Sequence, residues 1–249
     1  MSQTFDLRLA RARMLAPRVR ELAFERVDGA PGAFLPGQFL QLHFAGADGA
    51  ALKRSYSIAT VAGDPANPTG LIEIAVSYVE GGAATRLLGA LAPGELVQAS
   101  GPYGRFVLGA SDRNARYLLV ATGTGVTPYR AMLPELVRLH RERGIDVVLL
   151  QGARSGADLL YAHEFDAFAA AHPWFRYLPC LSREPRPVPG RDDRSGYVQH
   201  AFAGLAPDPA RDIAYLCGNP DMVDAGFEAL KACGLPVPVI RREKYLSAR

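Results

Sequence analysis

Residues 117–128, YLLVATGTGVTP, decide the fold of this chain. The apolar run at 117–121 is typical of a buried strand, and Gly123 and Gly125 follow it directly. Pro128 suits the first turn of the helix that residues 129–143 predict. A strand, a glycine turn and a helix in this order form one unit of a parallel sheet, and the glycines let a phosphate approach backbone N–H groups.

The spacing of these glycines limits the kind of nucleotide site. Gly123, Gly125 and Pro128 form GxGxxP, which is neither the GxGxxG of ordinary dehydrogenases nor the GK[ST] ending of a P-loop. A tight turn without a ligand is the alternative interpretation of the same residues. The pattern therefore indicates a phosphate site at a helix N-terminus without naming the nucleotide.

The alternation of strands and helices continues to the C-terminus. Helices are predicted at 164–172 and 221–234. The other segments of this pattern are 145–154, 175–182, 197–205 and 213–220. We therefore expect a parallel sheet whose ligand lies at the carboxyl ends of the strands.

The first 110 residues follow a different pattern. Turn signals separate short runs that predict strands, at 5–10, 19–27, 38–44, 54–60, 71–79 and 96–104. A single short helix is predicted at 84–91. Such strands indicate an antiparallel β-barrel or sandwich. We expect two domains, a β-barrel over 1–111 and an α/β domain over 112–249, as the length of 249 residues also favours.

Composition and charge exclude several classes of protein. Hydrophobic residues make up 49% and charged residues 21%, as in globular proteins, and a formal charge of +3 is too small to indicate nucleic-acid or membrane binding. The three cysteines and five histidines form no disulfide framework and no metal-binding motif, so we expect no metal. Without a long apolar run or a targeting peptide, we expect a cytoplasmic protein.

Two segments of the first half have the chemistry of a cofactor site. The run from Arg54 to Ser57 combines a guanidinium able to hold a pyrophosphate, a tyrosine able to stack on a flat ring and a hydroxyl. Alternation along a strand places Arg54 and Tyr56 on one face and Ser57 on the other. Residues 82–85 open the short helix and provide a second N-terminus suited to a phosphate. A surface strand and an ordinary capped helix are the alternatives.

Five short motifs occur in one order: RSYS at 54–57, GGAAT at 81–85, GPYGRF at 101–106, GTGVTP at 123–128 and CGNPDM at 217–222. This order resembles the ferredoxin–NADP reductase family over nearly the whole chain. The resemblance implies a stand-alone flavoprotein of the bacterial type that binds FAD and NADP(H). It would transfer electrons between NADPH and ferredoxin or flavodoxin, by hydride transfer to flavin N5 and then single-electron steps.

The resemblance also implies which residues hold the flavin. Tyr56 packs on the isoalloxazine, Ser57 lies near its N5 atom, and Arg54 grips the pyrophosphate. The residues that complete the phosphate site open the short helix; they are Gly82, Ala83, Ala84 and Thr85.

A third set of residues corresponds to the pyridine-nucleotide site of the family. The loop that binds the nucleotide pyrophosphate contains Gly123, Thr124, Gly125 and Pro128. Cys217 and Gly218 lie near the nicotinamide, where a compact side chain leaves the ring room to reach the flavin. A buried cysteine at a strand end is the alternative for Cys217.

The residues expected to bind the adenosine end of the nucleotide favour NADPH over NADH. Residues 182–184 and 197–199 resemble the SRE and YxQ segments of the family, in which the tyrosine covers adenine. A 2′-phosphate needs cations, whereas an NADH site more usually carries a carboxylate. The residues assigned here are Arg154, Ser182, Arg183, Arg191, Arg194 and Tyr197. Asp192 and Asp193 lie beside these arginines, and a solvated arginine loop is the alternative.

Glu243 and Tyr245 resemble the ending of the family, in which an aromatic residue shields the flavin and moves when the nicotinamide stacks. With Tyr56, Ser57 and Cys217, they are the expected catalytic residues. Four residues follow Tyr245, so either the ring still stacks or it is a surface residue.

The electron partner is the least specified part of the prediction. Ferredoxin or flavodoxin is expected, bound by a monomeric reductase, and Arg86, Arg105 and Arg116 could dock an acidic partner. An NAD(P)H-dependent flavin reductase or the reductase component of an oxygenase is the alternative. A non-enzymatic flavin-binding subunit is a third possibility, but such relatives carry a cysteine cluster that Cys217 and Cys233 cannot form.

Overall fold

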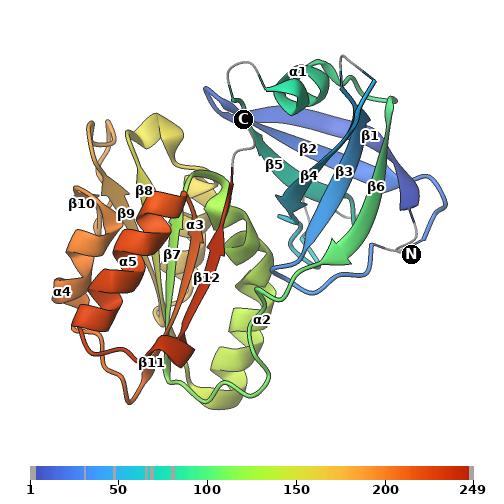
Figure 1. Ribbon diagram of the computed structural model, residues 1–249. Coiled ribbons are helices and arrows are strands. Elements are labelled where there is room, and N and C mark those ends of the chain that lie inside the picture. The colour runs from blue at the N-terminus through green and yellow to red at the C-terminus, as the bar shows by residue number, and fades with distance from the viewer. Residues whose placement is uncertain are drawn as a thin grey trace. The chain divides into compact units, whose positions relative to one another are not determined.

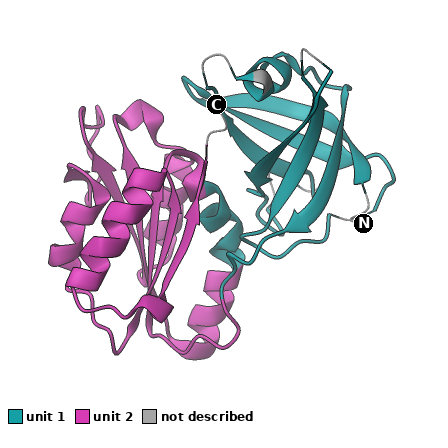
Figure 2. Cartoon of the chain, viewed as in Figure 1, with its two compact units in different colours: residues 1–108, 127–134, 247–249 teal, residues 109–126, 135–246 magenta. Residues whose placement is uncertain are grey.

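The computed structural model describes residues 4–30, 32–46, 49–64, 67, 70–79 and 82–246. The chain falls into two compact units (Figure 2). Unit 1 contains residues 1–108, 127–134 and 247–249, and unit 2 contains residues 109–126 and 135–246.

Unit 1 is built on a six-stranded antiparallel sheet in the order β4-β3-β6-β1-β2-β5 (Figure 1). The strands are β1 (Thr4–Ala16), β2 (Val19–Arg26), β3 (Phe39–Ala45), β4 (Ala51–Ser57), β5 (Ile72–Ser77) and β6 (Leu96–Tyr103). Ile58, just past β4, forms an isolated bridge with Ile74 of β5, which is the other edge strand. The sheet is therefore barrel-like, although among the described residues no continuous ladder joins β4 to β5.

Alternation along these strands places their apolar side chains on one face, where they form the core of unit 1. Its buried residues include Leu7, Leu9, Leu22, Phe24, Leu40, Leu42 and Ile74. Full burial of one such side chain stabilises the fold by about 1.5–3 kcal/mol. Helix α1 (Ala83–Ala90) joins this core through Leu88.

β1 is longer than the predicted strand at 5–10. Its pairing with β2 shifts register between Leu9 and Arg11, and the strand continues to Ala16 past this irregularity. Such a bulge changes which side chains face the core, so the apolar alternation breaks while the backbone pairing goes on. A prediction based on alternation ends the strand too early for this reason.

Unit 2 has a six-stranded parallel sheet in the order β10-β9-β8-β7-β11-β12. The strands are β7 (Arg116–Thr122), β8 (Asp146–Ala153), β9 (Phe175–Leu181), β10 (Arg194–Ser195), β11 (Asp212–Gly218) and β12 (Ile240–Lys244). Its helices are α3 (Ala162–Ala171), α4 (Phe202–Leu205) and α5 (Pro220–Ala232), and the helix α2 (Thr127–Arg143) belongs to unit 1 over residues 127–134 and to unit 2 from Glu135 on. In Figure 1, α4 and α5 lie in front of this sheet, and their apolar side chains share its core.

β12 was not predicted from the sequence. Only Ile240 of its five residues is buried, because the strand lies at the edge of the sheet and pairs with β11 alone. An edge strand gains backbone hydrogen bonds without burying alternate side chains, so the charged sequence that follows Ile240 carries no strand pattern.

The expected fold, an antiparallel barrel followed by an α/β domain with a parallel sheet, is confirmed. Within the part of the chain that the structure describes, no helix has the length and apolar character needed to cross a membrane.

Candidate functional site

The nucleotide-site candidates meet at the carboxyl end of the parallel sheet. β7 and β11 are neighbours there, with Cys217 paired to Ala121. In the strand order, β8 and β9 lie on one side of β7, whereas β11 and β12 lie on its other side. The strand order thus reverses beside β7, and open α/β sheets bind ligands outside the carboxyl ends of strands at such a point.

The loops after β7 and β11 touch through their backbones. A Cβ atom on Gly125 would lie 2.2 Å from the carbonyl oxygen of Cys217. Gly218 has a φ of +126°, and a Cβ atom there would lie 2.5 Å from the carbonyl oxygen of Thr122. The amide of Asn219 donates to Oγ1 of Thr122 at 3.1 Å. Only glycine fits at both positions. The two loops therefore form a floor without side chains at these points, and a ligand could approach its backbone closely.

Two helices begin at this end of the sheet, and they differ in their caps. Asn219 caps α5, since its side chain accepts from the amides of Asp221 at 2.8 Å and Met222 at 3.4 Å. α2 has no side-chain cap and no acidic residue in its first turn, and it follows a 3₁₀ turn over Gly123–Val126. The start of α2 is therefore the better anion site.

Cys217 is fully buried and pairs in register with Glu243 of β12. Burial raises the pKa of the Cys217 thiol well above its ordinary value, the Glu243 charge raises it further, and a hydrogen bond from Tyr245 acts in the opposite direction. The amide of Tyr245 donates to the carbonyl of Gly218 at 2.8 Å. The structure thus brings Cys217, Glu243 and Tyr245 together. The Cys217 thiol is neutral, so it is better suited to act as a compact spacer than as a nucleophile.

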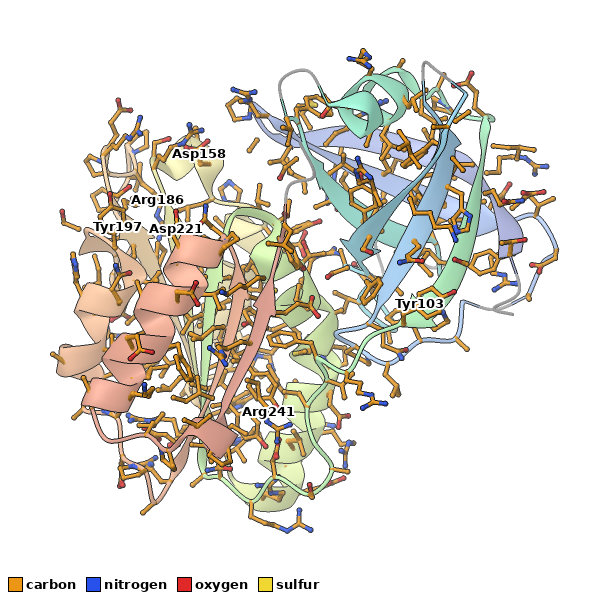
Figure 3. The ribbon with its side chains drawn as sticks, in the orientation of Figure 1. Tyr103, Asp158, Arg186, Tyr197, Asp221 and Arg241 are labelled. Carbon is orange, nitrogen blue, oxygen red and sulfur yellow. The ribbon has the colours of Figure 1, made fainter. Side chains whose placement is uncertain are left out.

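The loops after β8 and β9 carry the candidates for the adenosine end. The amide of Ser182 donates to the carbonyl of Ala153 at 3.0 Å, and that of Arg183 to the carbonyl of Arg154 at 2.9 Å. These bonds join the two loops side by side. Figure 3 labels Asp158, Arg186, Tyr197 and Asp221 at this end of the sheet, and Arg241 toward the other end.

The arginines of these loops differ in whether their side chains have partners. Arg183 and Arg191 are exposed, and no side-chain hydrogen bond or ion pair holds them within the described ranges. Arg194 donates to the carbonyl of Asp193 at 3.1 Å, and its Nη2 lies 3.6 Å from Oδ1 of Asp192. Arg154 makes two bonds of 3.1 Å to Asp158, but this pair is exposed and a phosphate could compete for it.

Tyr197 is 60% exposed, and its ring meets His200 edge-on with centroids 5.7 Å apart. It immediately precedes a 3₁₀ turn over Val198–Ala201. An exposed ring held on one side is suited to stack on a flat base.

The flavin candidates of unit 1 lie on β4. Arg54 pairs with Leu42 and Tyr56 with Leu40, so both share the face of the sheet that carries the core. Ser57 is buried on the opposite face. Burial raises the pKa of Tyr56 to about 12, which keeps its hydroxyl neutral and the residue suited to packing against a ring.

The start of α1 has the features of a phosphate site. Gly82 is its N-cap residue, and neither a side-chain cap nor an acidic residue occupies the first turn. The Thr85 hydroxyl accepts from the amide of Val79 at 2.9 Å, while its O–H can still donate. Ala84 belongs to the same turn, whereas the side chain of Ala83 and all of Gly81 lie outside the described residues.

Sequence reasoning missed two arginines whose partners lie far away in the chain. Arg130 of α2 is buried and donates to Glu73 of β5 at 2.6 Å. Arg186 forms ion pairs with Asp193 and Asp166. Nothing in the local pattern identifies such partners, because a residue type and its neighbours do not say which carboxylate it will meet.

One arginine suggested for docking has another role. Arg116 holds the buried carboxylate of Asp212 with bonds of 2.8 and 2.5 Å at the start of β7 and β11, the opposite end of the sheet from the loops above. It therefore supports strand pairing. Arg86 and Arg105 are exposed.

Within the described ranges, no group of three or more His, Cys, Asp or Glu side chains gathers as a metal site would require.

Two family models match the chain. An oxidoreductase FAD-binding domain matches residues 7–108, and an oxidoreductase NAD-binding domain matches residues 119–226. These ranges contain the flavin candidates of β4 and α1 and most of the nucleotide candidates.

Related proteins support the same assignment. Ferredoxin–NADP reductase B of Sorangium cellulosum is 37% identical over 98% of both chains. The reductase subunit of an aromatic O-demethylase from Amycolatopsis is 35% identical over 88% of this chain, which spans only 63% of that subunit.

Solved structures share the fold. The crystal structure of an Amycolatopsis cytochrome P450 reductase has a TM-score of 0.84 and 32% identity, covering 100% of this chain and 72% of its own. A ferredoxin NADP⁺ reductase from Neisseria gonorrhoeae with bound FAD and NADP has a TM-score of 0.81 at 19% identity, covering 98% and 99%. This chain therefore belongs to the ferredoxin–NADP reductase family and is a flavoprotein oxidoreductase that uses FAD and a pyridine nucleotide.

Proposed function

We propose that this protein transfers electrons between NADPH and ferredoxin or flavodoxin. The observation that carries this proposal is the match over 98% of both chains to a ferredoxin–NADP reductase, since the oxygenase-type relative is matched over only 63% of its length. When bound, FAD accepts a hydride from the nicotinamide and passes electrons on singly.

The residues of unit 1 bind and orient the flavin in this proposal. Tyr56 provides a neutral ring against which the isoalloxazine packs, and Ser57 provides the hydroxyl near N5. Arg54 and the first-turn amides of α1 hold the pyrophosphate, with Thr85 donating its O–H.

The residues that follow β7 and β11 orient the nucleotide. The turn over Gly123–Val126 and the uncapped start of α2 hold its pyrophosphate, and the floor at Gly218 leaves room for the nicotinamide beside Cys217. Tyr197 covers the adenine. Glu243 and Tyr245 border the same floor through their strand pairing and backbone bond to β11.

The proposed preference for NADPH rests on which charged side chains of the loop between β9 and β10 are paired. Arg183 and Arg191 are open to a 2′-phosphate, and the two carboxylates between Arg191 and Arg194 have partners. Asp193 is paired with Arg186, and Asp192 lies 3.2 Å from Arg176 and 3.6 Å from Arg194. The loop thus presents positive charge to the ligand.

An absorbance spectrum of the purified protein followed by anaerobic titration tests this function. Flavin bands that NADPH bleaches at much lower concentration than NADH would support it, and faster reduction of ferredoxin or flavodoxin than of free flavin would support the partner. A colourless protein that takes up no FAD, or one that prefers NADH, would contradict it.

A second candidate is the reductase component of an oxygenase. The similarity to the Amycolatopsis demethylase subunit and P450 reductase favours it. Faster electron transfer to an oxygenase than to ferredoxin or flavodoxin would identify this role.

We further propose a domain boundary at 111/112, a monomeric state and a cytoplasmic location. Light scattering during gel filtration tests the monomer, and fractionation of the host cell tests the location.

A further inference from the structure

The loop between β9 and β10 is folded around one inward-facing arginine. Arg186 has a side chain that is 14% exposed, whereas Arg183 and Arg191 of the same loop and Arg194 at the start of β10 are exposed. An arginine turned inward among three turned outward needs a local explanation, since guanidinium groups are rarely buried unless they are paired.

The guanidinium of Arg186 engages two carboxylates at once. Its Nε donates to Oδ2 of Asp193 at 2.9 Å and its Nη2 donates to Oδ1, so the pair is bidentate. Its Nη1 donates to Oδ2 of Asp166 in α3 at 2.6 Å. The amide of Gly190 adds a bond of 3.0 Å to Asp193. These bonds close the loop from residue 186 to residue 193 and tie it to α3.

Two glycines make room for this arginine. A Cβ atom on Gly190 would lie 2.2 Å from Nη2 of Arg186, and one on Gly156 would lie 2.9 Å from its Cγ. Gly156 belongs to the 3₁₀ turn Gly156–Asp158 that follows β8. Arg186 is therefore packed against both loops that carry candidates for the adenosine end.

The pairing also controls the charge of the loop. Burial acts to raise the pKa of Asp193, but the bonds from Arg186 and Gly190 outweigh it, and the pKa lies below its usual range. Asp193 is therefore ionised at neutral pH. Without Arg186 its negative charge would be left beside Arg194, with which it also interacts.

We propose that Arg186 is a positioning residue for the 2′-phosphate of the nucleotide. It holds the loop so that Arg183, Arg191 and Arg194 point outward, and it neutralises the carboxylate of Asp193 beside Arg194. This inference rests on the proposed use of NADPH, and Arg186 itself does not contact the phosphate.

Calorimetric binding of two probes to the full chain tests this role without electron transfer. Adenosine 2′,5′-bisphosphate carries the 2′-phosphate, and adenosine 5′-monophosphate lacks it. Arg138→Gln is the matched control, because Arg138 also pairs with two carboxylates, Glu135 and Glu142, but on an exposed face of α2.

We expect Arg186→Gln to weaken bisphosphate binding about tenfold, the lower end of what loss of an orienting partner costs at metal sites, and to leave monophosphate binding within about twofold. The double variant Arg186→Gln/Asp193→Asn should regain part of the affinity, because the unpaired carboxylate is gone. Circular dichroism checks that each variant is folded, and Arg186→Lys provides a milder change that keeps the charge but loses the bidentate geometry.

The outcomes separate the two hypotheses. Equal affinity of the unaltered protein for both probes would overturn the NADPH preference and this inference with it. A preference for the bisphosphate that Arg186→Gln and Arg186→Lys keep as fully as Arg138→Gln would overturn only the role of Arg186. Equal loss for both probes would also overturn it, because the arginine would then hold the fold and not the phosphate site.

Discussion

Gly125 lies against the carbonyl group of Cys217, so closely that a Cβ atom on Gly125 would be 2.2 Å from that oxygen. Gly125→Ala must therefore push apart the loops after β7 and β11. A displacement of about 1 Å in a binding site can cost about a hundredfold in rate, and we expect a loss of that order in the rate of flavin reduction by NADPH.

A matched control is available for this change. Gly204 in α4 has no atom within 4 Å of an added Cβ, so Gly204→Ala should leave the reduction rate unchanged. Stopped-flow absorbance measures both variants. Equal rates in the two alanine variants would mean that the contact between the loops has no part in nucleotide use.

Arg183→Ala should raise the KM for NADPH much more than that for NADH. The Arg183 side chain is exposed and has no side-chain partner in the described ranges, so its loss removes a cation without disturbing a structural bond. Steady-state kinetics with both nucleotides measures the effect, and Arg138→Gln on an exposed face of α2 is the control. Equal changes in both KM values would remove Arg183 from the phosphate site.

Arg130→Met should destabilise the protein by about 3–5 kcal/mol, because it leaves a buried carboxylate without its main partner. Glu73 is 1% exposed and accepts from Arg130 at 2.6 Å and from Arg11 at 2.7 Å, and Arg130 also donates to the carbonyl of Ala59 at 2.8 Å.

Urea unfolding measures this loss of free energy. Arg138→Gln on the same helix removes exposed ion pairs, which solvent screens, and should leave the free energy of unfolding nearly unchanged. A similar cost for both arginines would show that the buried pair contributes little.

Stability should fall at alkaline pH, in part through Cys180. Burial raises the pKa of this thiol from 9.0 to about 12. Below pH 9 the thiol is protonated in both the folded and unfolded chains. Between pH 9 and about 12 only the unfolded chain loses the proton, so the free energy of unfolding decreases as pH rises.

Cys180→Ala should remove this contribution, which amounts to no more than about 1.4 kcal/mol per pH unit. Unfolding curves at several pH values above and below 9 give the slope for both proteins. The tyrosines titrate in both, so the difference between them isolates Cys180, and identical slopes would contradict the prediction.

Tyr245→Ala and truncation after Lys244 should each alter the flavin absorbance or the turnover of NADPH. Tyr245 is bonded to Gly218 through its backbone and to Cys217 through its side chain, which places it beside the expected nicotinamide position. Leu246→Ala is the control, because Leu246 is 80% exposed. Unchanged spectra and turnover would remove Tyr245 from the site.

Much of this protein could be predicted from local patterns. The apolar run before Gly123, the turn and α2 are encoded in one short stretch, because buried strands and helix starts have characteristic neighbours in sequence. The strands of unit 1 were found in the same way, through the alternation that a half-buried strand requires. The order of five short motifs then predicted the family to which the chain belongs.

The sequence by itself thus determined the order of most strands and helices, the glycine loop and the family. Only the tertiary structure decided that Glu73 meets Arg130, that Asp193 meets Arg186 and that the charged segment after Ile240 pairs with β11. Strand and helix patterns arise from hydrogen bonding and burial between near neighbours in the chain. The choice of a distant partner depends on which groups the packed fold brings within a few ångströms, and no local pattern contains that information.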